Sequence, residues 1–306
     1  MKLMLRVAVV VSAFILVSLS TPASAWQDDD KAEPVAKGAD LYCTGFISDA
    51  SPRADLQIIG AVQENMKATY AQGDVVFLSK GREAGVQPGA VYYIIRPLGL
   101  IKHPFSKKKL GHYVRELGLL RVLEVSSKTS TAEILVSCDI VEFGDLLKPY
   151  EEMESPTRRE HRPLPRYGEG SGGVTGQIVM SPGFYENLSA NRVVFLDLGA
   201  RQDVQPGDYF TIYREIGPRE GITVTPKDDV VKDRSRGYSS DRYRGGNLSV
   251  QAPRKPLEDV LKTRPEIPRK VLGELVVLKV EKNTCVAKIT RTTDVVTIGD
   301  FVERAN

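Results

Sequence analysis

The side chains that most often carry out chemistry are few in this sequence, and their spacing matches no known reactive motif. The histidines are His103, His112 and His161, and the first two flank a lysine run at 107–109. Positive neighbours oppose the capture of a metal cation, and no cysteine or carboxylate cluster completes a zinc set. GxSxG, HExxH and P-loop motifs are absent from the sequence. We therefore predict no metal site, no cofactor and no enzyme activity.

Two other features invite a catalytic interpretation and do not support one. Asp145 and Asp300 each follow a glycine, one in either half of the chain. We expect each to bond its own turn backbone, because carboxylates in separate domains do not form the close pair of a glycosidase. The stretch SGGVTG, Ser171 to Gly176, comes nearest to a phosphate-binding loop, but it follows a linker-like segment. Neither feature defines an active site.

The cysteines are three, which leaves at least one of them without a partner inside the chain. They are Cys43, Cys138 and Cys285, and no two are close enough to form a CxxC redox motif. We expect a disulfide between Cys43 and Cys138, which both lie beside strand patterns in the first half, and a lone buried thiol at Cys285. The alternative is that all three are small buried apolar side chains.

The first 25 residues have the pattern of a signal peptide. Two basic residues precede an apolar run from Val7 to Leu19, and small residues at Ala23 and Ala25 place cleavage before Trp26. The run is shorter than a membrane-spanning helix needs, so we expect no transmembrane anchor after cleavage. The sequence therefore predicts an exported protein, periplasmic or secreted, in a compartment where disulfides persist.

The charge of the chain is nearly balanced. The full sequence has 42 Lys and Arg against 39 Asp and Glu, and the signal peptide contains two of the basic residues, which leaves 40 against 39. A dedicated nucleic-acid binder has a clear basic excess. We therefore expect no nucleic acid among the partners.

One stretch of the sequence occurs twice. GVQPGAVYYIIR, Gly85 to Arg96, returns as DVQPGDYFTIYR, Asp203 to Arg214, at a spacing of 118. The pairs Val75–Leu78 with Val193–Leu196 keep that spacing. Later pairs, such as Leu117-Gly118 with Leu272-Gly273, keep a spacing of 155, so one insertion of 155 − 118 = 37 residues separates the two registers. The sequence indicates a duplicated domain.

Both copies consist of short runs rich in Val, Ile, Tyr, Phe and Thr, bounded by Gly, Pro, Asp and Asn. This pattern predicts an all-β fold of two tandem small barrels or sandwiches, with a type II turn at each Gln-Pro-Gly. Aligned apolar positions should be buried in both copies, including Phe77 with Phe195 and Ile94 with Ile212. The expected segments are a signal peptide at 1–25, disorder at 26–38, β domains at 39–150 and 173–306, a linker at 151–172, and a flexible insertion at 215–271 of the second domain.

With the copies aligned, each reads as Val-x-Pro-Gly, strand, Arg, variable segment, Leu-Gly, two strands, Gly-Asp and a last strand. This order resembles the C-terminal domain of flagellar assembly protein T, over roughly Leu56 to Tyr150 and Val174 to Val302. The resemblance implies a bacterial envelope protein whose β domains make contacts and do no chemistry.

Two functions are compatible with these observations. The first is a periplasmic or envelope scaffold that binds another protein through loops. The second is a module that binds a cell-wall polymer, such as peptidoglycan or an anionic glycan. Both copies break register after the strand that ends at Arg96 or Arg214, and we expect contact loops there, at 97–116 and 215–271. Their candidate contact residues are Lys102, Phe105, Lys107, Lys108, Lys109, Tyr113, Arg236, Tyr238, Arg242, Tyr243 and Arg244.

Overall fold

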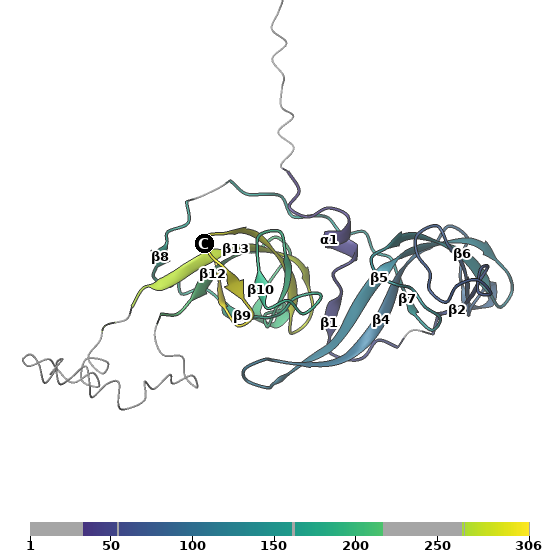
Figure 1. Cartoon of the computed structure of the whole chain (residues 1–306), viewed down its shortest axis with the longest axis horizontal. Helices are drawn as coiled ribbons and strands as arrows, with labels where there is room; N and C mark the ends of the chain where they lie inside the picture. The colour runs from purple at the N-terminus through teal and green to yellow at the C-terminus, as the bar shows by residue number, and fades with distance from the viewer. Residues whose placement is uncertain (1–32, 54, 161–162, 217–264, 266, 306) are drawn as a thin grey trace, which may run out of the picture. The chain divides into compact units, whose positions relative to one another are not determined.

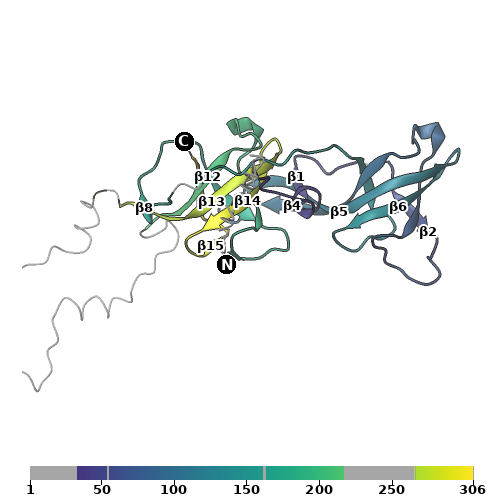
Figure 2. The same ribbon diagram turned by 90° about the horizontal axis from the view of Figure 1, so that it is seen from above.

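The computed structural model describes residues 33–53, 55–160, 163–216, 265 and 267–305. Residues from Glu33 onward form one compact unit. Its fold is nearly all β, as the sequence predicts, and consists of two small barrels with attached segments (Figure 1 and Figure 2). We refer to the barrel in the first half of the chain as barrel 1 and the barrel in the second half as barrel 2.

Barrel 1 is built from six strands. An isolated bridge between Gln57 and Leu146 joins its two outer strands, and the amide of Leu147 donates to the carbonyl of Leu56 beside it at 2.9 Å. A short strand, β1 (Phe46–Ser48), pairs with β5 outside the barrel, and helix α1 (Ala39–Tyr42) precedes it. The barrel strands in spatial order are β2 (Ile58–Ala61), β3 (Val75–Leu78), β6 (Ser130–Ser137), β5 (Lys109–Val125), β4 (Val91–Lys102) and β7 (Leu146–Pro149).

Barrel 2 closes through direct antiparallel pairing of β12 (Tyr209–Arg214) with β13 (Arg269–Val280). The two-residue strand β8 (Tyr167–Gly168) adds to β13, while β10 (Asn187–Leu188) and β15 (Val296–Thr297) form a separate pair. Short 3₁₀ turns, Arg82–Ala84 and Ala200–Gln202, follow the equivalent strands β3 and β11 along the chain. The barrel strands in spatial order are β12 (Tyr209–Arg214), β16 (Phe301–Arg304), β9 (Thr175–Met180), β11 (Val193–Leu196), β14 (Cys285–Thr292) and β13 (Arg269–Val280).

The two barrels have the same strand order. Strands β2, β3, β4, β5, β6 and β7 correspond to β9, β11, β12, β13, β14 and β16, and each barrel encloses its own apolar core. Ile94 and Ile212 are both fully buried, as expected. A duplicated domain would produce this correspondence, and duplication remains our interpretation of the sequence register.

The repeated Gln-Pro-Gly forms a turn in both barrels. Gly89 and Gly207 have φ of 80° and 92°, values that an L side chain rarely adopts. In each turn the amide after the glycine donates to the glutamine carbonyl, from Ala90 to Gln87 at 3.3 Å and from Asp208 to Gln205 at 3.1 Å. Proline at the second position and a positive φ at the third define a type II turn. The repeated motif is therefore a structural corner.

The paired aspartates bond their own turns and also hold an arginine. The Asp145 carboxylate accepts from the Glu142 amide at 2.8 Å and from Arg96 Nε at 2.7 Å. In barrel 2, Asp300 accepts from the Thr297 amide and from Arg214 Nε, both at 2.7 Å. The turn bond agrees with the sequence expectation. The arginine was missed, although Arg96 and Arg214 recur at the same spacing as their strands.

The cysteines are arranged as the sequence suggested. Cys43 and Cys138 form a disulfide with a Cα–Cα distance of 5.6 Å, which ties the segment before β1 to the end of β6. Cys285 is a free thiol and is fully buried in the barrel 2 core. Burial raises the pKa of this thiol, so it is not a reactive nucleophile.

Three local expectations are wrong. The segment 97–116 is not a loop, because β4 and β5 run on as one long hairpin that turns at residues 103–108 (Figure 1). Within the segment expected to be disordered, Val35 and Ala36 are buried against Val276 and Leu278. The expected linker also packs on the fold, where Met153 contacts the apolar cluster outside β4 and β5 of barrel 1. Each of these segments looks polar in sequence but buries some of its apolar side chains.

Candidate protein-docking surface

The distal half of the β4–β5 hairpin and the strand β1 together form an arm that packs on barrel 2. We define the arm as residues 46–48 and 97–114. Its buried side chains Ile47, Leu110 and Tyr113 form one apolar cluster with side chains of barrel 2. The Tyr113 ring meets Phe195 edge to face, with 5.6 Å between centroids. The cluster removes the outer surface of β9, β11 and β14 from solvent.

Polar contacts flank this apolar cluster. The buried Glu116 carboxylate in β5 binds Lys279 Nζ of β13 at 2.8 Å. Burial lowers the pKa of Lys279, while Glu116 favours the charged form and raises it. At the hairpin turn, His103 Nδ1 accepts from the amide of Phe105 at 3.2 Å, and its Nε2 lies 3.4 Å from Asp197 of barrel 2. The arm is therefore fixed to barrel 2 at both ends.

A row of outward-facing side chains on barrel 2 is covered by two segments, because the arm packs on Val179, Phe195 and Val286 while Val35 and Ala36 pack on Leu278. Phe195 pairs with Val286 on one side and with Met180 on the other, and Val179 is the bulged residue beside that pair. Across β14, Leu278 is bulged in the same way between Val277 and Lys279. The row Val179, Phe195, Val286 and Leu278 runs across four neighbouring strands, and all four side chains are at least 95% buried.

The corresponding row on barrel 1 lies open to solvent. Phe77 pairs with Thr131, and the bulged residues beside them are Ile59 in β2 and Leu123 in β5. The exposed fractions are 45% for Ile59, 37% for Phe77 and 41% for Leu123. The expectation that Phe77 would be buried like Phe195 is wrong. The cause is that no described segment covers barrel 1 as the arm covers barrel 2.

This contrast makes the barrel 1 row the candidate site. Large exposed apolar side chains are ordinary when scattered singly, but a contiguous group marks an interaction surface. Ile59 and Phe77 lie on neighbouring paired strands, and Thr131 joins Phe77 to Leu123 across the next two strands. The equivalent positions in barrel 2 are already buried in an intramolecular contact with other segments of the chain. We call the group Ile59, Phe77, Thr131 and Leu123 the open row.

The predicted contact residues are in different surroundings. Lys102 and the run Lys107, Lys108 and Lys109 are exposed near the hairpin turn, and Phe105 is half exposed. The Phe105 ring lies against the backbone of Gly299, where an added Cβ would clash with the ring. Tyr113 is buried in the arm contact, so its ring is not available to another partner. Arg236, Tyr238, Arg242, Tyr243 and Arg244 lie outside the described residues.

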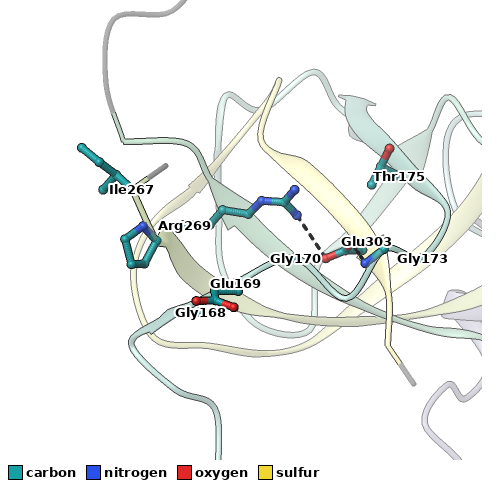
Figure 3. Close-up of a pocket in the computed structure, with 10 residues that line it drawn as sticks. Gly168, Glu169, Gly170, Gly173, Thr175, Ile267, Arg269 and Glu303 are labelled. Carbon is teal, nitrogen blue, oxygen red and sulfur yellow. Dashed lines mark hydrogen bonds and ion pairs between the residues drawn. The ribbon is translucent and has the colours of Figure 1, made fainter. Parts of the chain in front are cut away.

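The glycine-rich loop Ser171–Gly176 borders a pocket of about 430 Å³ on barrel 2 (Figure 3). Its backbone amides are already used, because Ser171 and Gly172 each donate to the Glu303 carboxylate at 3.0 Å. Figure 3 shows that Arg269 points to the same carboxylate, and its Nη1 lies 3.1 Å from Glu303 Oε2. The chain's own anion thus occupies the position that a phosphate would take. This geometry does not favour a phosphate loop.

A second cavity, of about 530 Å³, lies beside β1 and β7. Lys148 stands 5.2 Å from the Phe46 ring, and Lys80 forms a 3.3 Å ion pair with Asp55 at the margin. Glu281 reaches the same cavity, and burial raises the pKa of this carboxyl. The cavity is mixed in charge and has an aromatic wall made by Phe46 and Tyr92.

Within the described ranges, no group of three or more His, Cys, Asp or Glu side chains is placed to hold a metal ion. In that same part of the chain, no helix is long and apolar enough to cross a membrane. Neither a family model nor a curated protein sequence matches the chain. The likeness to flagellar assembly protein T is therefore an interpretation of the repeated motif.

Proposed function

We propose that this protein is a non-enzymatic scaffold or adaptor of the bacterial envelope, and that it binds another protein through the open row of barrel 1. One observation carries the proposal. The row that is buried on barrel 2 by the arm and by Val35 and Ala36 has an equivalent on barrel 1, and there Ile59, Phe77 and Leu123 are 37–45% exposed. Exposed apolar surface costs free energy in water, and its burial by a partner recovers it.

Export is the second part of the proposal. Its support is the signal-peptide pattern of residues 1–25 together with the disulfide between Cys43 and Cys138. Disulfides persist in exported proteins and are rare in the cytosol. A partner would then be another envelope protein, and the resemblance to a flagellar assembly domain is compatible with that location.

The test compares three forms of the chain as bait in envelope extracts of cells that were treated with a short-range crosslinker. They are the wild type, Phe77→Asp in the open row, and Val295→Asp as a control at a side chain that is also exposed, at 53%, but lies on barrel 2. We expect one discrete partner to be retained by the wild type and the control and lost from Phe77→Asp. Equal retention by all three forms would show that the open row is not the binding surface.

A second candidate function is binding of an anionic cell-wall glycan in the cavity beside β1. The observation in its favour is the combination of Lys80 and Lys148 with the aromatic side chains Phe46 and Tyr92. Aromatic faces stack on sugar rings, and lysines attract acidic groups. Retention on protein-free sacculi that is lost in Lys148→Glu and kept in Phe77→Asp would favour this function over the first.

A further inference from the structure

The covering of barrel 2 indicates what kind of segment fits the open row. The arm consists of β1 and the extension of β4 and β5 beyond barrel 1, and it presents Ile47, Leu110 and Tyr113. Because β4 and β5 correspond to β12 and β13, the equivalent extension of barrel 2 is the chain between Ile216 and the start of β13 at Arg269. Most of this segment, 217–264, lies outside the described residues.

The charges around the two rows are reversed. On barrel 2, Lys279 binds Glu116 at 2.8 Å and Lys288 binds Asp40 at 2.7 Å, so each of these two lysines beside the covered row meets a carboxylate from the first half of the chain. The corresponding positions on barrel 1, 155 residues earlier, are Glu124 and Glu133. Glu124 is exposed and Glu133 is half-buried, 3.9 Å from Arg121. The open row therefore suits a covering segment with a basic excess.

The segment 217–264 has that excess. It contains eleven Lys and Arg against seven Asp and Glu, in a chain whose remainder is close to balance. It also contains apolar and aromatic side chains that could fill the row, among them Val230, Val231, Tyr238 and Tyr243. Opposite charge at the flanks selects the partner and its orientation, while the apolar row supplies most of the contact area.

We propose that the open row of barrel 1 binds a second copy of this chain, which presents its segment 217–264, so that copies associate head to tail. This inference rests on the proposed function and names its partner. The contact is heterologous, because the row and the segment are different parts of the chain. Each pair of copies keeps one free row and one free segment, so further copies add at both ends.

The experiment is sedimentation velocity of the exported form of the chain over about a hundredfold range of concentration. Three variants accompany the wild type. Phe77→Asp has a damaged row and an intact segment. Arg236→Glu, Arg242→Glu and Arg244→Glu, combined in one chain, leave the row intact and reverse the charge of the segment. Val295→Asp is the control, and thermal melting by circular dichroism establishes that every variant is folded.

We expect the wild type and Val295→Asp to form species larger than a dimer as concentration rises. Each of the other two variants alone should associate at least about 30-fold more weakly, the effect of losing a central contact residue. A mixture of these two should form a one-to-one dimer and nothing larger, because only one row and one segment in the pair are functional. High salt should weaken all association.

Several results would overturn the inference. These are a wild type that stays monomeric at every concentration, a charge-reversed variant that associates like the wild type, and a mixture that stays monomeric. A face-to-face dimer of two open rows is detected as association that survives charge reversal. If the wild type is monomeric but still captures a different envelope protein in a Phe77-dependent manner, the second copy is excluded and the proposed function stands. If the wild type is monomeric and also captures no envelope protein in a Phe77-dependent manner, both the inference and the proposed function are rejected.

Discussion

The equivalent phenylalanines Phe77 and Phe195 allow a direct measurement of how much the arm contributes. They share a residue type and occupy equivalent strand positions in the two barrels, and they differ in that the arm covers only Phe195. Phe195 is fully buried and Phe77 is 37% exposed. Truncation of each to alanine therefore compares the same side chain with and without the covering segment.

The expected difference follows from the exposed area. A phenylalanine side chain that is fully buried on folding removes roughly 200 Å² from water, and 37% of that area is about 75 Å². At about 25 cal/mol per Å², this area corresponds to about 2 kcal/mol. Phe→Ala in a core costs about 3–5 kcal/mol, so we expect that range for Phe195→Ala and about 1–3 kcal/mol for Phe77→Ala.

The assay is urea unfolding followed by far-ultraviolet circular dichroism, at protein concentrations low enough to prevent self-association. Ile94→Ala and Ile212→Ala serve as controls, because both side chains are fully buried inside their barrels and should cost similar amounts. Equal costs for the two phenylalanines, with matched isoleucine controls, would refute the reasoning. That result would mean either that Phe77 is covered or that the arm does not pack on Phe195.

Three further predictions concern groups that hold the fold together. Glu116→Ala should destabilise the chain by about 3–5 kcal/mol in urea unfolding, because it leaves Lys279 buried without its partner. The double variant Glu116→Gln with Lys279→Met should destabilise the chain clearly less. An equal loss of stability in the two variants would contradict the ion-pair account. Replacement of both Cys43 and Cys138 by serine should lower stability by about 4–5 kcal/mol in the loop-entropy model, given their separation of 95 residues, and an unchanged urea midpoint would contradict it. Burial raises the pKa of Glu281 above 4.5 in the folded chain, so the contribution of this carboxyl to stability is full below pH 4.5 and is lost as pH rises through the raised pKa. Glu281→Gln should remove that part of the pH dependence of the urea midpoint. A pH profile identical to that of the wild type would show that Glu281 is not its source.

The barrel cores could be predicted from sequence because they depend on local patterns. Alternating apolar residues, the Gln-Pro-Gly turn and the spacing of 118 between Ile94 and Ile212 all report on positions inside one barrel. The turns at Asp145 and Asp300 were predictable for the same reason, since the side chain bonds an amide three residues earlier.

The candidate site could not be predicted in this way. Phe77 and Phe195 are equivalent in local sequence, and what distinguishes them is the arm, which brings Tyr113 to Phe195 across 82 residues of chain. The lysines and glycines of the hairpin turn indicated a loop, while the strand pairing of Lys102 with Lys109 extends the sheet almost to that turn. One signal was present. The outward position opposite phenylalanine is Val286 in barrel 2 and Thr131 in barrel 1, a polar substitution that accompanies the loss of cover.

The most direct test of the account is photocrosslinking from position 77 in intact cells. A photoreactive phenylalanine analogue replaces Phe77 in the full chain, and in separate strains it replaces Phe195 and Tyr167, which is half exposed on β8. The account predicts a discrete intermolecular adduct from position 77, crosslinks confined to the same chain from position 195, and none of the discrete adduct from position 167. The absence of an intermolecular adduct from position 77, with the protein folded and exported, would contradict the claim that the open row is a protein-docking surface.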